Sequence, residues 1–231
     1  MKIVILSGTS CVGKTPLLNA MQRVYPNFRF SRPLLYTSRS PRPGEKDGVD
    51  YHFRTEPEIQ GLNTDRFAIA KTRQLWQAVD VRELMRMSGD SGIVIFDIYP
   101  TLARKLISHQ EIAHTDKEIK WLKIFIQPAT LQDIDNVRRA MGDVSRAEAL
   151  TAIQVTKLVK RARNQGVKLT GAVMQDISIR AQKAWEEVLC GQEYDHVLTN
   201  HDGEESPHWN ETPPLGEAGE TLQHFYKIVS G

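Results

Sequence analysis

The chain is poor in the features that mark secreted, disulfide-stabilised and membrane proteins. It has only 2 cysteines, Cys11 and Cys190, and their spacing suggests neither a metal site nor a disulfide framework, which favours a reducing compartment. No apolar run is long enough to cross a bilayer, and the first apolar segment is too short for a signal peptide. We therefore expect a cytoplasmic protein without a membrane partner.

An excess of charge of one sign is also absent. The 30 Lys and Arg residues against 28 Asp and Glu residues leave a net charge of +2, which is too small to indicate a nucleic-acid partner. The 7 histidines show no metal-ligand spacing. A chain of 231 residues that is 40% hydrophobic and 25% charged has the size and composition of one globular domain. The sequence leaves open whether the protein is a monomer or a homodimer.

The first chemical signal is a glycine-containing segment near the amino end. Residues 8–15 read Gly-Thr-Ser-Cys-Val-Gly-Lys-Thr, which matches the G-x-x-x-x-G-K-T pattern of a phosphate-binding P-loop. An apolar run precedes it at residues 2–7, and apolar residues with helical spacing follow it up to residue 24. A strand, a glycine loop and a helix in this order are the setting that the pattern requires. A chance match is expected in about one chain of this size in a hundred, so we favour the phosphate-binding interpretation.

A P-loop assigns a role to each part of the segment. Its backbone N–H groups surround phosphate oxygens, and the following helix adds a favourable dipole. Lys14 would reach the β- and γ-phosphates of ATP, and the Thr15 hydroxyl would bind Mg²⁺. ATP and Mg²⁺ are therefore the expected cofactors. The predicted ATP-binding residues of the loop are Gly8, Thr9, Ser10, Cys11, Val12, Gly13, Lys14 and Thr15.

The alternation of apolar and helical segments predicts an α/β fold with a mainly parallel sheet. The expected strands are residues 2–7, 92–98, 121–127 and 196–199. The expected helices are residues 14–24, about 77–88, 100–109, 129–140, 147–163, 176–190 and 218–229. Together with the P-loop, this order predicts a P-loop NTPase fold in which phosphate binds at the carboxyl edge of the strands.

Two regions interrupt the alternation and divide the predicted single domain. Residues 31–91 begin with a segment rich in Arg, Pro, Gly and Thr, and we expect them to form a small inserted acceptor-binding subdomain. Residues 138–183 are helical and basic, and we expect a lid rather than a nucleic-acid surface because apolar residues recur among the charges. The core would then comprise residues 1–30, 92–137 and 184–231. Residues 201–217 are predicted to form an exposed loop.

A second anion-binding pattern lies within the inserted region. Residues 37–53 read Thr-Ser-Arg-Ser-Pro-Arg-Pro-Gly-Glu-Lys-Asp-Gly-Val-Asp-Tyr-His-Phe. Arg39 and Arg42 lie on a proline-stiffened loop, and a guanidinium can bind phosphate oxygens bidentately. Tyr51 could add a hydroxyl donor, and Glu45 could orient one arginine. On its own, this segment would be interpreted as a solvated surface loop. In a chain that also carries a P-loop, it predicts a clamp for a phosphorylated acceptor.

This second pattern strongly resembles the signature of the guanylate kinase family, which it matches position by position. The P-loop stands at the usual distance upstream, and the resemblance extends over most of the chain. It implies transfer of the γ-phosphate of ATP to GMP or dGMP. It also implies an acceptor site of Ser38, Arg39, Arg42, Tyr51 and Glu45, with Asp97 near the acceptor or the metal. The remaining roles that it implies are an adenine contact from Asn200 and catalytic arginines at Arg39, Arg138, Arg139 and Arg180 beside Lys14.

The positions that read guanine in the family are altered here. The family glutamate corresponds to Ile69, the hydroxyl-bearing segment ends at Ala78, and a second aspartate corresponds to Tyr99. The family serine ahead of the signature is replaced near Leu35. If these residues line the base pocket, guanine is not strongly favoured, because rejecting a wrong base requires buried polar groups. Candidates to replace the missing polar groups are Asp65, Asp80 and Glu83.

Three functions therefore remain open. The first is a kinase that acts on GMP or dGMP. The second is a P-loop kinase for another nucleotide or for a phosphosugar such as ribose bisphosphate. The third is a non-catalytic module that binds a phosphorylated protein, which the intact P-loop disfavours. A kinase of this kind needs no general base, because a phosphate acceptor with a second pKa of about 6 is already a dianion at neutral pH.

Overall fold

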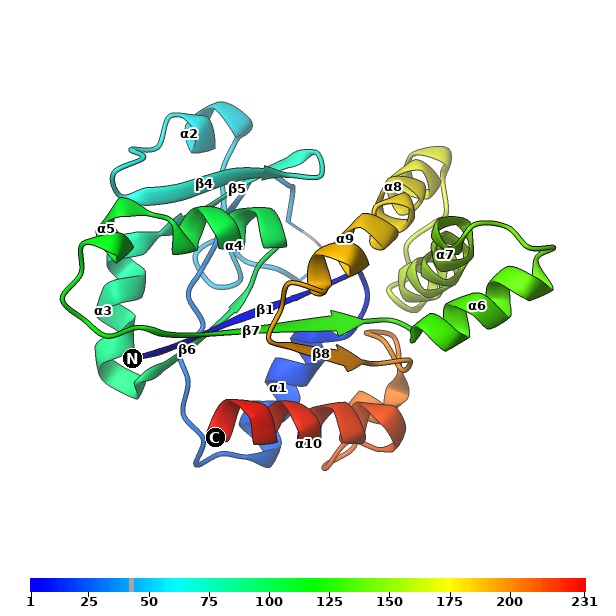
Figure 1. The fold of residues 1–231 in the computed structure, drawn as a ribbon. Helices are drawn as coiled ribbons and strands as arrows, with labels where there is room; N and C mark the ends of the chain where they lie inside the picture. Colours follow the sequence, from blue (N-terminus) through cyan, green and yellow to red (C-terminus); the bar gives the residue numbers. More distant parts are fainter. Residues whose placement is uncertain (42–43) are drawn as a thin grey trace. The chain divides into compact units, whose positions relative to one another are not determined.

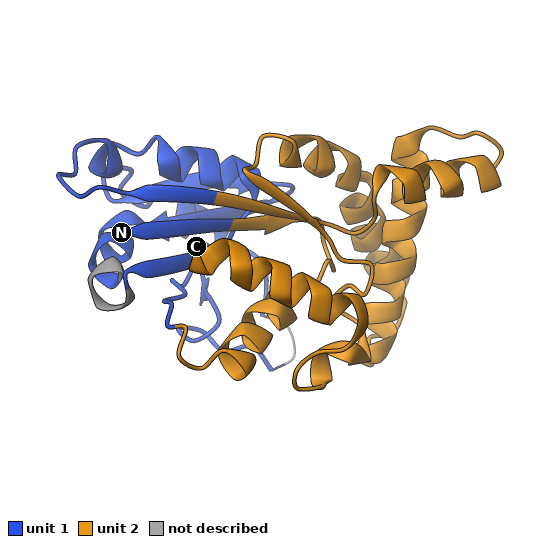
Figure 2. Ribbon diagram, turned by 60° about the horizontal axis from the view of Figure 1, so that its bottom comes forward, with its two compact units in different colours: residues 1–5, 29–122 blue, residues 6–28, 123–231 orange. Residues whose placement is uncertain are grey.

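The computed structural model describes residues 1–41 and 44–231, with the backbone alone described at residues 88–91. A four-stranded sheet has the order β6-β1-β7-β8 (Figure 1). A second four-stranded sheet has the order β3-β2-β5-β4. The chain forms two compact units, residues 1–5 with 29–122 and residues 6–28 with 123–231 (Figure 2). Among the residues that the structure describes, every helix is too short or too polar to traverse a bilayer.

The first sheet contains the strands that the apolar runs predict. Its members are β1 (Lys2–Gly8), β6 (Ile93–Asp97), β7 (Lys120–Gln127) and β8 (His196–Thr199). Residues Ile3 to Leu6 of β1 are fully buried, as expected for a strand that is covered on both faces and therefore reads as a continuous apolar run. β7 and β8 pair in parallel, with Phe125 opposite Val197. The predicted α/β fold with a mainly parallel sheet is confirmed.

The unit that contains residues 29–122 is built around the second sheet. Its elements are β2 (Tyr36–Thr37), β3 (His52–Phe53), α2 (Glu56–Gln60), β4 (Phe67–Thr72), β5 (Leu75–Asp80), α3 (Val81–Ser91), α4 (Pro100–Ile107) and α5 (Gln110–Ala113), together with β6 of the first sheet. In the strand register, Thr37 pairs with Phe53 on one side and with Gln77 on the other. Gln77 also pairs with Ala70 across the β4–β5 hairpin. These pairings decide which side chains share a face of this sheet.

The helix predicted over residues 77–88 begins later than expected. Residues up to Asp80 continue strand β5, and α3 starts at Val81. The physical reason is the cap: Asp80 Oδ1 accepts hydrogen bonds from the backbone N–H groups of Arg82 (3.1 Å) and Glu83 (3.2 Å). An aspartate that satisfies the first free N–H groups fixes the start of a helix at the next residue.

The unit that contains residues 6–28 and 123–231 is mostly helical. Its helices are α1 (Lys14–Val24), α6 (Leu131–Ala140), α7 (Arg146–Asn164), α8 (Gly171–Gln182), α9 (Ala184–Gly191), the short 3₁₀ helix η1 (Pro207–Asn210) and α10 (Gly216–Ser230). The single helix predicted over residues 176–190 is wrong, since α8 and α9 are separate helices that meet at Lys183. The two helices pack into different hydrophobic clusters. Ile177 of α8 packs with α7, whereas Val188 of α9 packs with Phe125.

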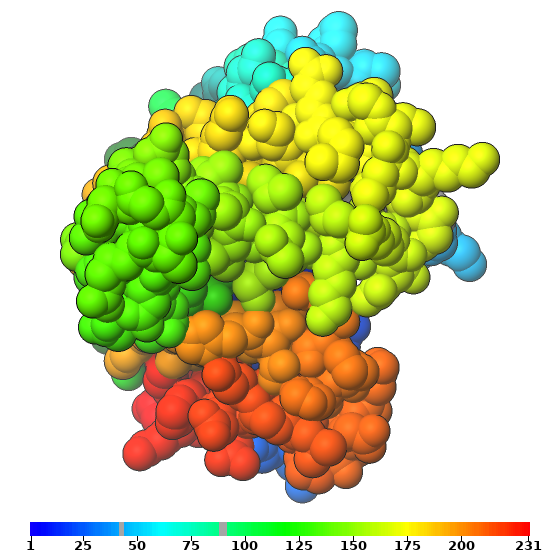
Figure 3. Space-filling model, turned by 90° about the vertical axis from the view of Figure 1, so that its right-hand side faces the viewer, coloured from blue at the N-terminus to red at the C-terminus, as the bar shows by residue number. Residues whose placement is uncertain are grey.

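The segment 201–217 is not the wholly exposed loop that its composition predicts. It contains η1 and the start of α10, and Trp209 is only 4% exposed. The Trp209 indole donates a hydrogen bond to the Gly203 carbonyl (2.6 Å), while Arg23 of α1 donates to the Trp209 carbonyl (2.7 Å). Figure 3 shows the surface of this segment in orange, next to the green and yellow lid helices.

Candidate active site

The P-loop joins β1 to α1 as the sequence predicts. Gly13 caps α1 with φ +93°, a left-handed conformation that glycine adopts without strain. Gly8 is required because there is no room for a side chain: a Cβ atom there would lie 2.5 Å from the carbonyl oxygen of Ile126. No acidic residue lies in the first turn of α1. The loop therefore offers an anion a helix N-terminus whose first turn carries no carboxylate.

The lysine and threonine of the motif lie at the start of α1. The Lys14 ammonium donates hydrogen bonds to the carbonyl oxygens of Gly8 and Thr9, each at 3.3 Å. Its charge thus lies across the loop, at the place where the motif would bind phosphate oxygens. Thr15 is exposed in the first turn of α1.

Two buried amides from distant parts of the chain hold the loop. Gln154 of α7 donates to the Thr9 hydroxyl (2.7 Å), and Asn200, directly after β8, donates to the Val12 carbonyl (2.8 Å). Both residues are fully buried. The contact of Asn200 with adenine that the resemblance implies stays a prediction. The sequence analysis did not identify Gln154. The available signal was a polar residue on the apolar stripe of α7, between Leu150 and Leu158.

The loop also packs on the two lid helices through Cys11. This residue is 3% exposed, and it contacts a cluster that includes Leu158 of α7 and Ile177 of α8. Its thiol donates to Glu205 Oε2 at 3.1 Å. Burial raises the pKa of the Cys11 thiol far above its usual range, and Glu205 adds to the shift. A buried thiol that stays protonated is a poor nucleophile, so Cys11 serves packing.

We expect thiol reagents to discriminate between the two cysteines. Cys190 is only half-buried, so a disulfide reagent such as dithiobisnitrobenzoate should modify it at least about tenfold faster than Cys11 in the native protein. Both should react at similar rates after unfolding in guanidinium chloride. Peptide mass spectrometry at successive times would show the order, and equal native rates would contradict the assignment of Cys11 to a packing role.

The arginines predicted to act from the lid belong to the same unit as the P-loop. Arg138 of α6 forms ion pairs with Asp135 (3.6 Å) and Asp143 (3.4 Å). Arg139 donates to the side chain of Asn136, and Arg180 of α8 pairs with Asp176 (2.9 Å). In this state, these contacts hold the arginines on local partners. Their role in phosphate binding stays a prediction.

The predicted acceptor residues lie in the other unit, around an arginine that is held in place. Arg39 and Glu45 form a bidentate pair, with nitrogen–oxygen distances of 2.6 and 2.7 Å. Burial opposes the charge on Arg39, but the hydrogen bond and the negative charge of Glu45 raise its pKa. The guanidinium lies over the Tyr51 ring, 4.8 Å from its centre, and over the Phe53 ring at 5.4 Å. Ser38 is next to Arg39 along the chain, whereas Arg42 lies outside the described residues.

Strand register places the Arg39 cluster on one face of the second sheet. Directly paired residues share a face, and neighbours along a strand point to opposite faces. Phe53 therefore shares a face with Thr37 and Gln77. We call this the acceptor face, because Arg39 lies over the Phe53 and Tyr51 rings.

Ile69 and Ala78, which the ungapped alignment places at guanine-reading positions, lie on the face opposite the acceptor face in this register. The two residues pair with each other, and Ala78 also pairs with Tyr36, so all three lie on the face opposite Gln77. There they join an apolar cluster with Ile59 of α2. An ungapped alignment fixes neither the hairpin length nor the side-chain alternation, and a shift by one residue exchanges the faces.

Two of the three polar residues suggested as substitutes, Asp65 and Asp80, hold other parts of the structure together. The buried Asp80 carboxylate accepts from Arg66 (2.6 Å) and caps α3. Asp65 accepts from Gln110 (2.9 Å). Asp97 is the last residue of β6, and the Arg73 guanidinium stacks 4.5 Å from the centre of the Tyr99 ring. Tyr99 thus contacts the turn of the β4–β5 hairpin.

A histidine that the sequence reasoning set aside joins three helices of the P-loop unit. His201 contacts Asp133 at the start of α6 (Nε2 to Oδ2, 2.8 Å) and Glu217 at the start of α10. Lys157 of α7 donates to its carbonyl oxygen. Burial alone would lower the pKa of His201, but the hydrogen bonds to Asp133 and Glu217 outweigh it and raise the pKa.

The His201 contacts predict a stability that depends on pH. The folded pKa is above the unfolded value of about 6.5, so the contribution is complete below that pH and is lost as pH rises through the folded pKa. His201→Gln should lower the free energy of unfolding by about 1 kcal/mol or less near pH 6, since the groups are partly exposed. Near pH 9 the substitution should cost less stability, because the contribution of protonated His201 is lost as pH rises through its folded pKa. Urea unfolding at both pH values measures the loss, and the exposed His114→Gln is the control. A loss of stability that is the same at both pH values would contradict this prediction.

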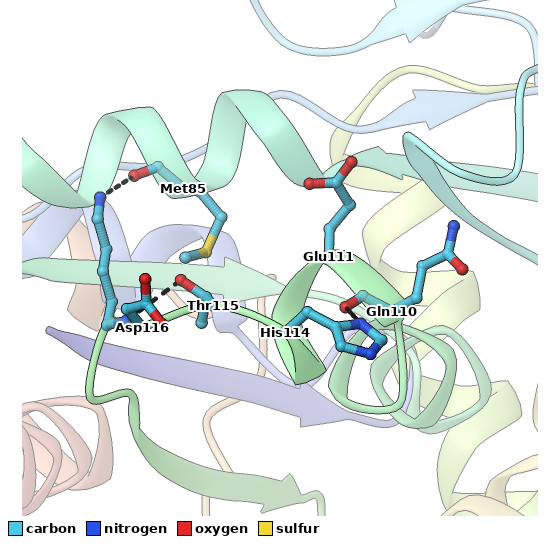
Figure 4. A pocket seen from close by; sticks show the side chains of 7 residues that line it. Met85, Gln110, Glu111, His114, Thr115 and Asp116 are labelled. Atoms are coloured by element: carbon cyan, nitrogen blue, oxygen red, sulfur yellow. Dashed lines mark hydrogen bonds between the residues drawn. The ribbon is translucent and has the colours of Figure 1, made fainter.

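A separate open cavity of about 480 Å³ lies beside α3 and α5 (Figure 4). Its lining residues are Met85, Gln110, Glu111, His114, Thr115, Asp116 and Lys117. None of them belongs to the predicted site. The Lys117 ammonium is bound to the Met85 carbonyl (3.1 Å) and His114 to the Gln110 carbonyl (2.8 Å). We therefore keep this cavity apart from the candidate active site.

The strand–loop–helix P-loop motif on a mainly parallel sheet, together with the partly buried Arg39–Glu45 pair, is typical of a P-loop kinase. Within that class the assignment is specific: the model of the guanylate kinase family matches residues 1–165. The chain belongs to the guanylate kinase family.

Individual relatives agree with this assignment. The guanylate kinase of Rickettsia bellii (strain RML369-C) is 27% identical over 202 residues, which cover 87% of this chain and 86% of that protein. The guanylate kinase of Mycobacterium tuberculosis (strain CDC 1551 / Oshkosh) is 46% identical over a shorter stretch of 61 residues, 26% of this chain and 28% of that one. The crystal structure of guanylate kinase from Anaplasma phagocytophilum shares the fold, with a TM-score of 0.57 at 19% identity over 99% of this chain and 84% of that one.

Proposed function

We propose that the protein transfers the γ-phosphate of ATP to a nucleoside monophosphate. The observation that supports this proposal is the presence of two candidate anion sites of different kinds in one chain. One is the intact P-loop with Lys14, and the other is the bidentate Arg39–Glu45 pair. Membership of the guanylate kinase family supports a nucleotide as the acceptor.

The donor site fits ATP with Mg²⁺. Among the described residues, no group of three or more His, Cys, Asp and Glu side chains could hold a metal ion. Mg²⁺ does not need such a group, because it keeps several waters and binds through one or two protein oxygens plus substrate phosphates. The exposed Thr15 hydroxyl would supply that oxygen, with Asp97 as an indirect contributor. When bound there, Mg²⁺ would neutralise charge on the β- and γ-phosphates.

The chain's own residues would then position the two substrates. Backbone N–H groups of the P-loop and the Lys14 ammonium would hold the donor phosphates. Arg39, with Arg42, Ser38 and Tyr51, would hold the acceptor phosphate, whose dianion attacks without a general base. Glu45 would keep the Arg39 fork in one orientation, so less conformational entropy is lost on binding.

The lid would complete the site. We propose that Arg138, Arg139 and Arg180 leave their local partners and bind the equatorial oxygens of the transferring group. This step would exclude water and limit ATP hydrolysis. The acceptor-binding region 31–91, the lid 138–183 and the core formed by the rest of the chain are the parts that this mechanism needs. We further propose a cytoplasmic enzyme without nucleic-acid or membrane partners.

A coupled assay of ADP release tests this proposal. Purified protein with Mg-ATP should form ADP only when an acceptor is added, and the acceptors to compare are the common nucleoside monophosphates and ribose bisphosphate. Acceptor-dependent ADP with a nucleotide supports the proposal. Activity with the phosphosugar alone would replace it with the second function considered above. Absence of ADP with every acceptor would favour a non-catalytic module.

A further inference from the structure

The acceptor face carries two buried polar side chains, Thr37 and Gln77, and one of them has a hydroxyl without a partner. The Thr37 hydroxyl belongs to a residue that is 1% exposed, and it has no hydrogen-bond partner among the described residues. Its register partner Gln77 is 7% exposed and accepts one hydrogen bond, from the Thr72 hydroxyl at 2.9 Å. Of these two side chains, the Thr37 hydroxyl is the buried group without a partner. Buried polar groups are rarely left unsatisfied unless a ligand or water completes them.

These groups lie beside the proposed phosphate clamp. Thr37 pairs with Phe53, over which Arg39 lies, and Gln77 is the next residue across the same face. The chain runs directly from Thr37 through Ser38 to Arg39. A nucleotide whose phosphate is held by Arg39 would therefore find Thr37 and Gln77 as the nearest buried polar side chains on that face.

The rest of this face is apolar. Ala70 pairs with Gln77, while Ala68 pairs with Val79, and all of these residues are buried. Among the described residues of β2, β4 and β5, no carboxylate lies on the acceptor face. Guanine has adjacent N1–H and 2-amino donors, and a carboxylate is the group that accepts both. Without one, a buried 2-amino group would be left unpaired, and such a group strongly opposes binding.

A carboxamide has a different preference. It presents one donor and one acceptor side by side, which matches the base edges on which a donor lies next to an acceptor. The Thr72 and Thr37 hydroxyls can each rotate to donate or to accept. Adenine, cytosine, uracil and thymine offer such edges without an additional amino group beside the alanines.

We infer that Gln77, supported by Thr37 and Thr72, is the specificity-determining residue of the acceptor site, and that the acceptor is a nucleoside monophosphate with a base other than guanine. This inference rests on the proposed function for the identity of the phosphate site. It concerns base selection alone, so it can be tested by binding without turnover.

Isothermal titration calorimetry with Mg-ADP present is the test. The ligands are AMP, CMP, UMP, dTMP and GMP, with ribose 5-phosphate as the acceptor that lacks a base. We expect the wild-type protein to bind at least one of the first four at least about tenfold more tightly than GMP, which corresponds to the loss of one buried hydrogen-bonded contact. Gln77→Leu should remove that preference and leave the affinity for ribose 5-phosphate unchanged. Gln77→Glu should shift the preference toward GMP.

Two further variants control for effects on the hairpin surface and on folding. Gln74→Leu changes an exposed glutamine in the same hairpin and should bind like wild type. If Gln77→Leu does not fold, as judged by circular dichroism, Thr37→Val removes a buried hydroxyl at nearly constant volume and should also reduce the preference. The inference is overturned if wild type binds GMP best, or if both variants keep the wild-type order. If base selection changes as expected while no acceptor yields ADP, the proposed kinase function fails and the assignment of Gln77 stands.

Discussion

Replacing Lys14 with alanine is expected to abolish measurable turnover, with a fall in kcat of at least about a thousandfold, or about 4 kcal/mol. The ammonium lies across the P-loop carbonyls of Gly8 and Thr9, where it would neutralise charge that moves between the phosphates. Charge that is fixed in advance contributes most in the transition state, so the loss should appear in kcat more than in the KM for ATP. Steady-state rates of ADP release measure both constants.

A matched control separates the loss of this charge from a general loss of stability. Lys227 is an exposed lysine in the last turn of α10, and Lys227→Ala should retain the wild-type rate. Thermal unfolding of both variants would show that each is folded. A Lys14→Ala rate within a few-fold of wild type would remove this lysine from the proposed chemistry.

Replacing Arg39 with alanine should affect the acceptor rather than the donor. Hydrogen bonds between charged groups are worth about 1.5–3 kcal/mol each, so kcat/KM for the acceptor should fall about a hundredfold or more. Arg39→Lys keeps the charge but loses the planar fork, and it should recover only part of the loss. The KM for ATP at saturating acceptor should change little, because the P-loop belongs to the other compact unit.

The control for Arg39 lies in the same region. Arg54 pairs with Asp47 (3.0 Å) at the surface, with 36% of the arginine side chain exposed, and exposed pairs contribute little. Arg54→Ala should therefore behave like wild type in both constants. Equal losses for ATP and acceptor in Arg39→Ala would show that Arg39 stabilises the fold instead of binding the acceptor.

The elements that depend on neighbouring residues could be predicted from the sequence. The P-loop follows from the spacing between Gly8 and Thr15, because its glycines and lysine must lie at fixed offsets on a strand–helix junction. The four strands of the first sheet follow from apolar runs that are buried on both faces. The Arg39–Glu45 pair could be proposed because its partners lie six residues apart on one loop.

The elements that depend on distant contacts could not be predicted. Gln154 and Thr9 are far apart in the chain, and nothing in either local pattern indicates their hydrogen bond. The alternation of the β4–β5 hairpin depends on its turn length, so the sequence could not show that Ile69 and Ala78 lie on the face opposite Gln77. The burial of Trp209 depends on α1, which contacts it from the opposite end of the sequence through Arg23.

One titration tests most directly whether the two anion sites serve a single reaction. A bisubstrate analogue that links adenosine to an acceptor nucleoside through a polyphosphate chain can be titrated by calorimetry into wild type, Lys14→Ala and Arg39→Ala. We expect one analogue to bind per chain, more tightly than ADP or the nucleoside monophosphate alone, and each substitution to weaken it by at least about tenfold. Two analogues bound per chain, or an affinity unaffected by Arg39→Ala, would contradict phosphoryl transfer between these sites.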